Sequence, residues 1–193
     1  MRPPHYILAG GRSRRFGQDK ARADYHGRTL LQAVAQGFAG CVQDTWAVAG
    51  EEGDYDDLGV CTIADRHPGL GPLAGLETAL THRGANHGEG WALVSSCDLT
   101  DPSSRWLTPL FDTLSQAQPD SWAIVYRADD RWDPFPGLFH TRGMSAVRRA
   151  LSEPPRSMQK LLAGEGVLPA PCPPGATRVP QANTPEQLAG AQA

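Results

Sequence analysis

Short apolar runs alternate with helix-like segments along most of this chain, and this alternation constrains the fold more than any other feature. Apolar runs that are typical of buried strands occupy residues 5–9, 46–49, 60–63, 91–96 and 122–126. Segments that are typical of helices lie between them, at residues 30–38, 73–82 and 104–114. Strands and helices that alternate in this way predict a three-layer α/β fold with a mostly parallel sheet.

Prolines and capping residues organise the remainder of the chain. Pro134 and Pro136 predict a loop at residues 133–137, because proline cannot donate to the ladder of a central strand. The proline-rich stretch 169–174 predicts a connection. N-cap residues predict three more helices: Thr141 before 142–151, Ser157 before 158–162, and Thr184 before Pro185. We see no internal repeat and no dividing linker, so the 193 residues predict a single domain.

Composition and charge argue against several classes of protein. The 18 basic and 21 acidic residues give a formal charge of −3, so we expect no binding to nucleic acid. No apolar run approaches the roughly 20 residues of a membrane-spanning helix, so we expect no membrane association. The four cysteines are scattered, without the C-x-x-C spacing of a zinc or redox motif. Free thiols of this kind predict a cytoplasmic protein.

The loop after the first strand concentrates positive charge. Gly10 and Gly11 let the backbone approach an anion closely, with N–H groups turned toward it. Six of the 18 basic residues follow within a short stretch: Arg12, Arg14, Arg15, Lys20, Arg22 and Arg28. Ligands of open parallel sheets bind at the carboxyl ends of the strands, where this loop begins. The pattern fits a polyphosphate site, and it also fits a surface turn with solvated arginines.

Two familiar phosphate-binding motifs are absent from this loop. The chain has no G-x-G-x-x-G, and Gly17 is followed by Gln18-Asp19-Lys20 rather than by lysine and a hydroxyl residue. The pattern therefore argues against a Rossmann dinucleotide site and a P-loop. Of the 18 basic residues, 16 are arginine, and the two lysines are Lys20 and Lys160. A lysine in this loop thus raises the question of what arginine could not do there.

Asp98 is the candidate metal ligand, because it directly follows the apolar run 91–96 at the carboxyl edge of the sheet. Mg²⁺ is usually bound by one or two carboxylates, together with substrate phosphates and water. An aspartate at a strand end often caps the next helix instead. Asp101 and Ser103 are better placed for that role, which favours the metal for Asp98.

Four segments, taken in order, resemble the molybdenum cofactor guanylyltransferases, a family of nucleotidyltransferases with the Rossmann-like glycosyltransferase-A fold. The loop at residues 8–20 resembles the family's nucleotide loop. Residues 63–65, with the G-P-L-A-G turn at 71–75, resemble its aspartate segment. Ser96-Cys97-Asp98 resembles its metal-binding C-D motif, and residues 183–186 resemble its closing N-T-P-E segment. The matching segments span nearly the whole chain, which makes the resemblance far more specific than the loop alone.

The resemblance implies roles for individual residues on both substrates. The implied nucleotide-binding residues are Leu8, Ala9, Gly10, Gly11, Lys20, Asp65, Gly71, Gly75 and Asp98. Arg15 and Lys20 would contact the β- and γ-phosphates and Asp98 would hold Mg²⁺, so these three are the implied catalytic residues. Asn183 is implied on the acceptor side. The helix start at Arg156 and Ser157 is a further candidate for the acceptor's phosphate.

The family's reaction joins the GMP part of GTP to the terminal phosphate of molybdenum-bound molybdopterin and releases pyrophosphate, with Mg²⁺ as cofactor. The resemblance therefore implies GTP and molybdenum-molybdopterin as substrates, and transient contact with carrier or acceptor enzymes of the cofactor. Two positions depart from the family. Thr100 stands where many members have proline, and Ala49-Gly50 stands where some carry an asparagine that contacts the nucleoside. The second departure leaves the base preference open.

Three alternatives to this function stay open. A cytidylyltransferase for the same pterin and a sugar-phosphate nucleotidyltransferase would both keep the loop, Lys20 and Asp98. A non-catalytic nucleotide or pterin carrier would keep the fold alone. Retention of both Lys20 and Asp98 argues against the carrier, because a carrier has no leaving pyrophosphate to stabilise.

Overall fold

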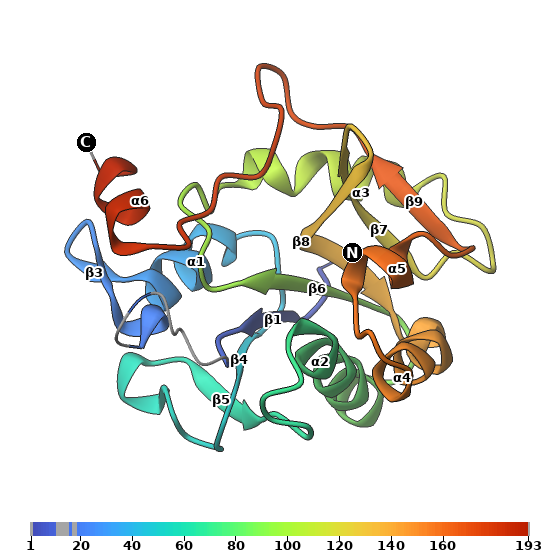
Figure 1. The fold of residues 1–193 in the computed structure, drawn as a ribbon, viewed down its shortest axis with the longest axis horizontal. Coiled ribbons are helices and arrows are strands. Elements are labelled where there is room, and N and C mark those ends of the chain that lie inside the picture. Colours follow the sequence, from blue (N-terminus) through green and yellow to red (C-terminus); the bar gives the residue numbers. More distant parts are fainter. Residues whose placement is uncertain (1, 11–15, 17–18, 193) are drawn as a thin grey trace.

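A seven-stranded sheet crosses the middle of the protein, in a computed structural model that describes residues 2–10, 16 and 19–192 (Figure 1). The strand order is β5-β4-β1-β6-β8-β7-β9. The strands are β1 (His5–Leu8), β4 (Thr45–Ala49), β5 (Cys61–Ala64), β6 (Trp91–Ser96), β7 (Ala123–Ala128), β8 (Arg131–His140) and β9 (Val167–Ala170). β8 runs antiparallel to both of its neighbours, and the other pairings in this sheet are parallel. The predicted α/β fold with a mostly parallel sheet is confirmed.

Helices cover both faces of the sheet and complete the three layers. One face carries α1 (Leu30–Phe38) and α3 (Thr108–Leu114), and the other carries α2 (Pro72–His87), α4 (Met144–Ser152) and α5 (Met158–Leu162). Successive side chains of a strand point to opposite faces. Ile7 therefore packs with Leu31 of α1, whereas its neighbour Tyr6 packs with Leu73 of α2.

A third apolar cluster ties the C-terminal segment to the N-terminal part of the chain. It combines Phe16, Tyr25 and Leu30 with Ala182 and Leu188. The elements around it are the 3-10 turn η1 (Lys20–Arg22), the hairpin β2 (Asp24–Tyr25) and β3 (Arg28–Thr29), and α6 (Pro185–Gly190). In Figure 1 the red C-terminal segment accordingly lies beside the blue segment that carries β3. This packing brings residues from both ends of the sequence to one side of the sheet.

The prediction of a loop at residues 133–137 is wrong, since both Pro134 and Pro136 lie inside the strand β8. The pairing explains how the strand accommodates them. The register between β7 and β8 shifts between Ile124 and Tyr126, and β6 pairs with β8 from Gly137 onward. The two prolines therefore fall in a bulge, where no neighbouring strand requires their missing N–H.

The proline-rich connection predicted at 169–174 is also partly wrong, because β9 includes Pro169. β9 is the last strand in the sheet order, and an edge strand tolerates proline. The helix expected at 104–114 is divided into the 3-10 turn η3 (Ser104–Trp106) and α3. A further 3-10 turn, η2 (Asp56–Leu58), precedes β5.

The predicted helix caps are confirmed at two of three positions. Ser157 Oγ accepts from Lys160 N at 3.4 Å, and Thr184 Oγ1 accepts from Gln187 N at 3.3 Å. Thr141 instead begins the 3-10 turn η4 (Thr141–Gly143), ahead of α4, and its Oγ1 accepts from Gly90 N at 3.1 Å. Among the helices that the structure describes, none has the length and apolar character needed to cross a membrane.

Candidate functional site

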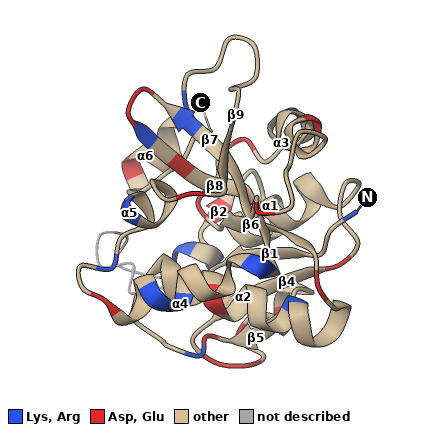
Figure 2. Ribbon diagram, turned by 90° about the vertical axis from the view of Figure 1, so that its right-hand side faces the viewer, with Lys and Arg blue, Asp and Glu red and all other residues tan. Residues whose placement is uncertain are grey.

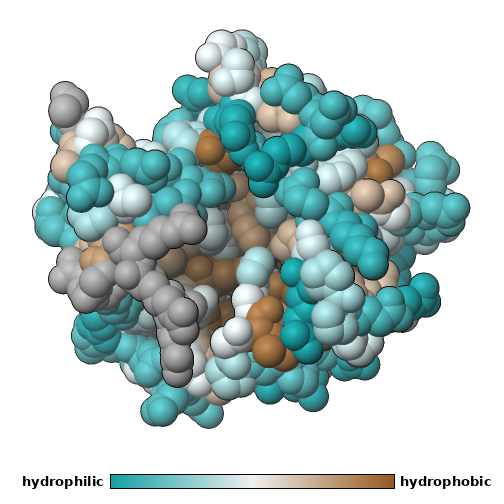
Figure 3. Space-filling view, in the orientation of Figure 1, coloured by the Kyte–Doolittle hydropathy of each residue, from teal (hydrophilic) through white to brown (hydrophobic). Residues whose placement is uncertain are grey.

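The carboxyl ends of β1, β4, β5 and β6 meet at one edge of the sheet, joined by backbone hydrogen bonds. These bonds run from Ala9 N and Gly10 N to Val48 O (2.9 and 3.0 Å), from Cys97 N to Leu8 O (3.2 Å), and from Asp65 N to Ala49 O (2.6 Å). On the face seen in Figure 3 the molecule is hollowed, with hydrophobic residues at the base of the hollow. The strand ends thus bring the predicted residues Leu8, Asp65 and Asp98 to a common edge.

Lys20, Asp98 and Asn183 converge there from three segments that are far apart in the sequence. Lys20 Nζ donates to Asp98 Oδ2 at 3.0 Å and to Asn183 Oδ1 at 3.5 Å. The Lys20 residue is only 9% exposed, so its charge is largely withdrawn from solvent and Asp98 compensates it. Three residues predicted separately from sequence motifs therefore form one polar cluster.

Local contacts fix each member of this cluster. Lys20 begins η1, and the side chain of Asp19 caps that turn by accepting from Ala21 N at 3.0 Å. The second oxygen of Asp98, Oδ1, accepts from Ser96 Oγ at 2.5 Å. The segment before Asn183 is held by a bond from Ala182 N to Asp98 O at 2.9 Å.

Asp65 lies one strand further along the same edge, after β5. Its Oδ1 accepts from His67 N at 3.0 Å and from Thr78 Oγ1 at 3.2 Å. Thr78 belongs to α2, so the side chain of Asp65 is tied to the helix that covers this part of the sheet.

Gly71 and Gly75 have structural reasons to be glycine. Gly71 has a φ of +81° at the N-cap of α2, in the left-handed region that favours glycine. A Cβ at Gly75 would lie 2.9 Å from Leu8 Cδ2, so the missing side chain lets α2 approach the end of β1. The nucleotide contacts predicted for both glycines stay predictions.

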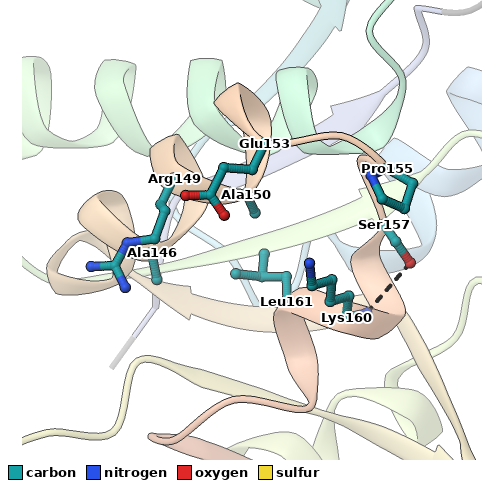
Figure 4. Close-up of a pocket in the computed structure, with 8 residues that line it drawn as sticks. All are labelled: Ala146, Arg149, Ala150, Glu153, Pro155, Ser157, Lys160 and Leu161. Carbon is teal, nitrogen blue, oxygen red and sulfur yellow. Dashed lines mark hydrogen bonds between the residues drawn. The ribbon is translucent and has the colours of Figure 1, made fainter.

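Arg156 and Ser157 have other partners than the polar cluster. Arg156 Nε donates to Leu151 O at 2.7 Å, at the end of α4, and Ser157 caps α5. Ser157 also lines a cavity of about 190 Å³ between α4 and α5 (Figure 4). No hydrogen bond of the described residues joins either to Lys20 or Asp98, and their acceptor role stays a prediction.

Two further predicted residues, Gly11 and Arg15, lie outside the described residues. Cys97, beside Asp98, is not a nucleophile in this arrangement. Its burial, together with the neighbouring Asp98, raises the pKa of the thiol to about 12, so the reactive thiolate is scarce at neutral pH.

Oxygen donors suited to a hard cation are present at the cluster. Asp98 offers a carboxylate and Asn183 an amide oxygen, and both atoms lie within 3.5 Å of Lys20 Nζ. Among the described residues there is no group of three or more His, Cys, Asp or Glu that could form a complete protein shell. Mg²⁺ seldom needs a complete shell of protein ligands, since it keeps waters and substrate phosphates as ligands. The residues present therefore fit Mg²⁺ bound together with a polyphosphate.

Several residues of the site were missed from the sequence. In the sequence, Ser96 stands out only as part of a motif, and Thr78 only as one position in a predicted helix. Glu77, also on α2, is 1% exposed and accepts from Arg66 Nη1 at 3.0 Å and from Arg148 Nε at 2.9 Å. A signal for Glu77 existed, because it is a charged residue within the apolar stripe of its helix.

The sheet and its flanking helices form the α/β nucleotidyltransferase fold, and solved structures agree with this assignment. Molybdopterin-guanine dinucleotide biosynthesis protein A from Archaeoglobus fulgidus superposes with a TM-score of 0.78 at 23% identity, covering 98% of this chain and 96% of that one. The 4-diphosphocytidyl-2C-methyl-D-erythritol synthase from Anaerococcus prevotii gives 0.67 at 12% identity, covering 99% and 96%.

The sequence comparisons identify the family. The model of the MobA-like NTP transferase domain matches residues 5–168. A Deinococcus radiodurans protein named "probable molybdenum cofactor guanylyltransferase" is 37% identical over 157 residues, which are 79% of this chain and 75% of that protein. A Bacillus cytotoxicus protein of the same name is 30% identical over 162 residues, 81% and 78% of the two chains. The chain belongs to the MobA-like NTP transferases and is a nucleotidyltransferase of molybdenum cofactor biosynthesis.

Proposed function

We propose that this enzyme transfers GMP from GTP to molybdenum-bound molybdopterin, forming the molybdopterin guanine dinucleotide cofactor and pyrophosphate. The observation that carries the proposal is the convergence of Lys20, Asp98 and Asn183 at the carboxyl edge of the sheet. The names of the relatives support GTP and the pterin as the substrates.

The chemistry of the proposed reaction suits this cluster. The attacking group is already a phosphate oxygen, so the reaction needs positioning and charge neutralisation rather than a strong base. The ammonium of Lys20 is a compact charge with three donors that can turn toward a departing pyrophosphate. Asn183 reaches the cluster on the C-terminal segment, where we propose that it faces the acceptor.

Transferases of this family generally use a divalent metal ion. We propose Mg²⁺ here, with Asp98 as its carboxylate ligand and Asn183 as a second oxygen donor. When bound, the ion neutralises charge on the phosphates. The four cysteines are free thiols, which supports the cytoplasmic location that we propose for the reaction.

The test is a transfer assay with GTP, CTP and ATP, each labelled at the α-phosphate, in the presence of Mg²⁺ and molybdenum-bound molybdopterin. We expect GTP to give labelled dinucleotide fastest, and a folded Asp98→Asn variant to give almost none. Faster product from CTP would contradict the guanylyl assignment. Transfer to sugar phosphates in preference to the pterin would contradict the acceptor. Nucleotide binding without any transfer would indicate a carrier.

A further inference from the structure

The loop after β5 is fastened to α2 by a threonine hydroxyl that the proposed chemistry does not use. Thr78 is 3% exposed, and its Oγ1 accepts from Arg66 N at 3.0 Å. The same hydroxyl lies 3.2 Å from Asp65 Oδ1. Since the N–H of Arg66 can only donate, the single hydroxyl proton is directed at the carboxylate. Thr78 thus orients Asp65 and holds the backbone that follows it.

These contacts leave the two oxygens of Asp65 in different situations. Oδ1 accepts from both Thr78 Oγ1 and His67 N. Oδ2 has no hydrogen-bond partner within the part of the chain that the structure describes. The Asp65 side chain is half-buried, and its backbone N–H is bound to Ala49 O at 2.6 Å. The carboxylate is therefore immobilised through one oxygen, and the other is left to accept from a ligand.

A buried carboxylate anchors the same loop a second time. Glu77 is 1% exposed and lies between Arg66 of the loop and Arg148 of α4. Figure 2 shows α2 beside α4, with acidic and basic bands on their ribbons. Thr81 Oγ1 also donates to it, at 3.2 Å. A buried carboxylate that is fully paired holds its partners firmly, because separating them would leave an uncompensated charge. Arg66, the residue directly after Asp65, is thus fixed at both its backbone and its side chain.

We propose that Thr78 is a positioning residue for nucleoside recognition, which holds Asp65 so that Oδ2 accepts a hydrogen bond from an O–H or N–H of the nucleoside. The inference rests on the proposed function and on the nucleotide contact that the resemblance implies for Asp65. A carboxylate oxygen accepts hydrogen bonds, and the nucleoside, unlike the polyphosphate, offers O–H and N–H donors. Thr78 acts through Asp65 and contacts no substrate itself. Its contribution therefore concerns the nucleoside half of the ligand and leaves the polyphosphate half untouched.

The experiment compares two ligands that separate these halves. The dissociation constants of GMP and of inorganic tripolyphosphate are measured by calorimetry for the wild type and for Thr78→Val, Thr78→Ala and Thr78→Ser. The two variants without a hydroxyl should weaken GMP binding roughly tenfold, the scale of one hydrogen bond to a charged group, with tripolyphosphate changed less than about twofold. Thr78→Ser restores the hydroxyl and should bind GMP like the wild type. Two hydroxyl-free variants are included so that misfolding of one leaves the other as the test.

A matched control comes from the opposite face of the sheet. Thr113 is a buried helical threonine on α3 whose Oγ1 donates to Pro109 O at 2.8 Å. Thr113→Val should leave the affinity for both ligands unchanged. An Asp65→Asn background should abolish the effect of Thr78→Val, because residues that act through one another are not additive.

Equal weakening of GMP and tripolyphosphate would overturn the proposal, since it would show a general disturbance of the site. Unchanged GMP affinity in both hydroxyl-free variants would overturn it as well. Failure of the proposed function would give a different result in the same binding measurements. A wild-type protein that prefers CMP over GMP refutes guanylyl transfer, and the comparison of CMP with tripolyphosphate then tests Thr78 in the same way.

Discussion

Replacing Lys20 with methionine is the sharpest test of the phosphate site, because methionine keeps most of the stem and removes the ammonium. In the free enzyme the Nζ atom is bound at 3.0 Å to Asp98 and at 3.5 Å to Asn183. We expect kcat to fall by about 10²–10³, or about 2.7–4 kcal/mol, the scale for one lost transition-state donor. The KM for GTP should change less, because the extra charge on pyrophosphate develops only as it leaves.

The same substitution should also lower the free energy of unfolding. The side chains of Lys20 and Asp98 are 11% and 17% exposed, so the variant leaves a nearly buried carboxylate with Ser96 as its remaining hydroxyl donor. Removing one partner of a buried pair costs about 3–5 kcal/mol, and the residual exposure places our expectation near the lower end. Adding Asp98→Asn removes the uncompensated charge. The double variant should therefore resist urea better than Lys20→Met alone.

Two controls separate chemistry from folding. Lys160 is the other lysine of the chain, and Lys160→Met should bind GTP with wild-type affinity. Lys20→Arg keeps the charge but replaces a compact ammonium with a planar fork, and we expect its kcat to fall by at least about tenfold. Single-turnover rates measured over a range of labelled GTP concentrations give the rate of transfer and the affinity for GTP separately, for the test variant and for both controls. Near-normal turnover in a folded Lys20→Met protein would refute the assigned phosphate role.

Two further substitutions test the packing and the titration of the core, both by urea unfolding. Gly75→Ala should be less stable than Gly84→Ala on the same helix by about 1–3 kcal/mol. Both gain helix propensity, but the new Cβ meets Leu8 at 2.9 Å in the first case and only a methyl group at 4.0 Å in the second. Burial lowers the pKa of His5 from 6.5 to about 3, so unfolding takes up a proton between these values. The stability that is present above pH 6.5 is lost at about 1.4 kcal/mol per pH unit below it. His5→Gln should remove that part of the slope, and equal slopes for both proteins would contradict the assignment.

The elements that could be predicted are those with a strong local signal. Apolar runs located five of the seven strands of the main sheet, well enough to place Lys20 and Asp98 at one edge, and capping residues such as Ser157 marked helix starts. β8 was missed because Pro134 and Pro136 are compatible with a strand only at a bulge. That bulge is a property of pairing with β7, and nothing in the local sequence encodes it.

The site could be predicted as far as its charged residues and no further. Asn183 was identified from a motif, but its approach to Lys20 depends on the cluster of Phe16, Ala182 and Leu188, which forms only in the folded chain. Thr78 left no signal, because a threonine that orients another side chain looks in sequence like any helical threonine.

The two halves of the site are held by different parts of the structure, and this division has a consequence for how substitutions act. Asp65 is fixed by Thr78 and by the Glu77 pairs, all on or against α2, which packs directly on the sheet. The segments of Lys20 and Asn183 instead contribute Phe16, Ala23 and Ala182 to the smaller third cluster, while Ala21 packs in the main core. Elements with fewer buried contacts open more readily than those in the main core. A substitution that destabilises the third cluster should therefore weaken phosphate binding more than it weakens the nucleoside contacts. A Leu188→Ala variant should accordingly lose affinity for tripolyphosphate by a larger factor than for GMP. Thr78→Val should show the reverse, with the larger loss for GMP. The same order of losses in both variants would contradict this division of the site.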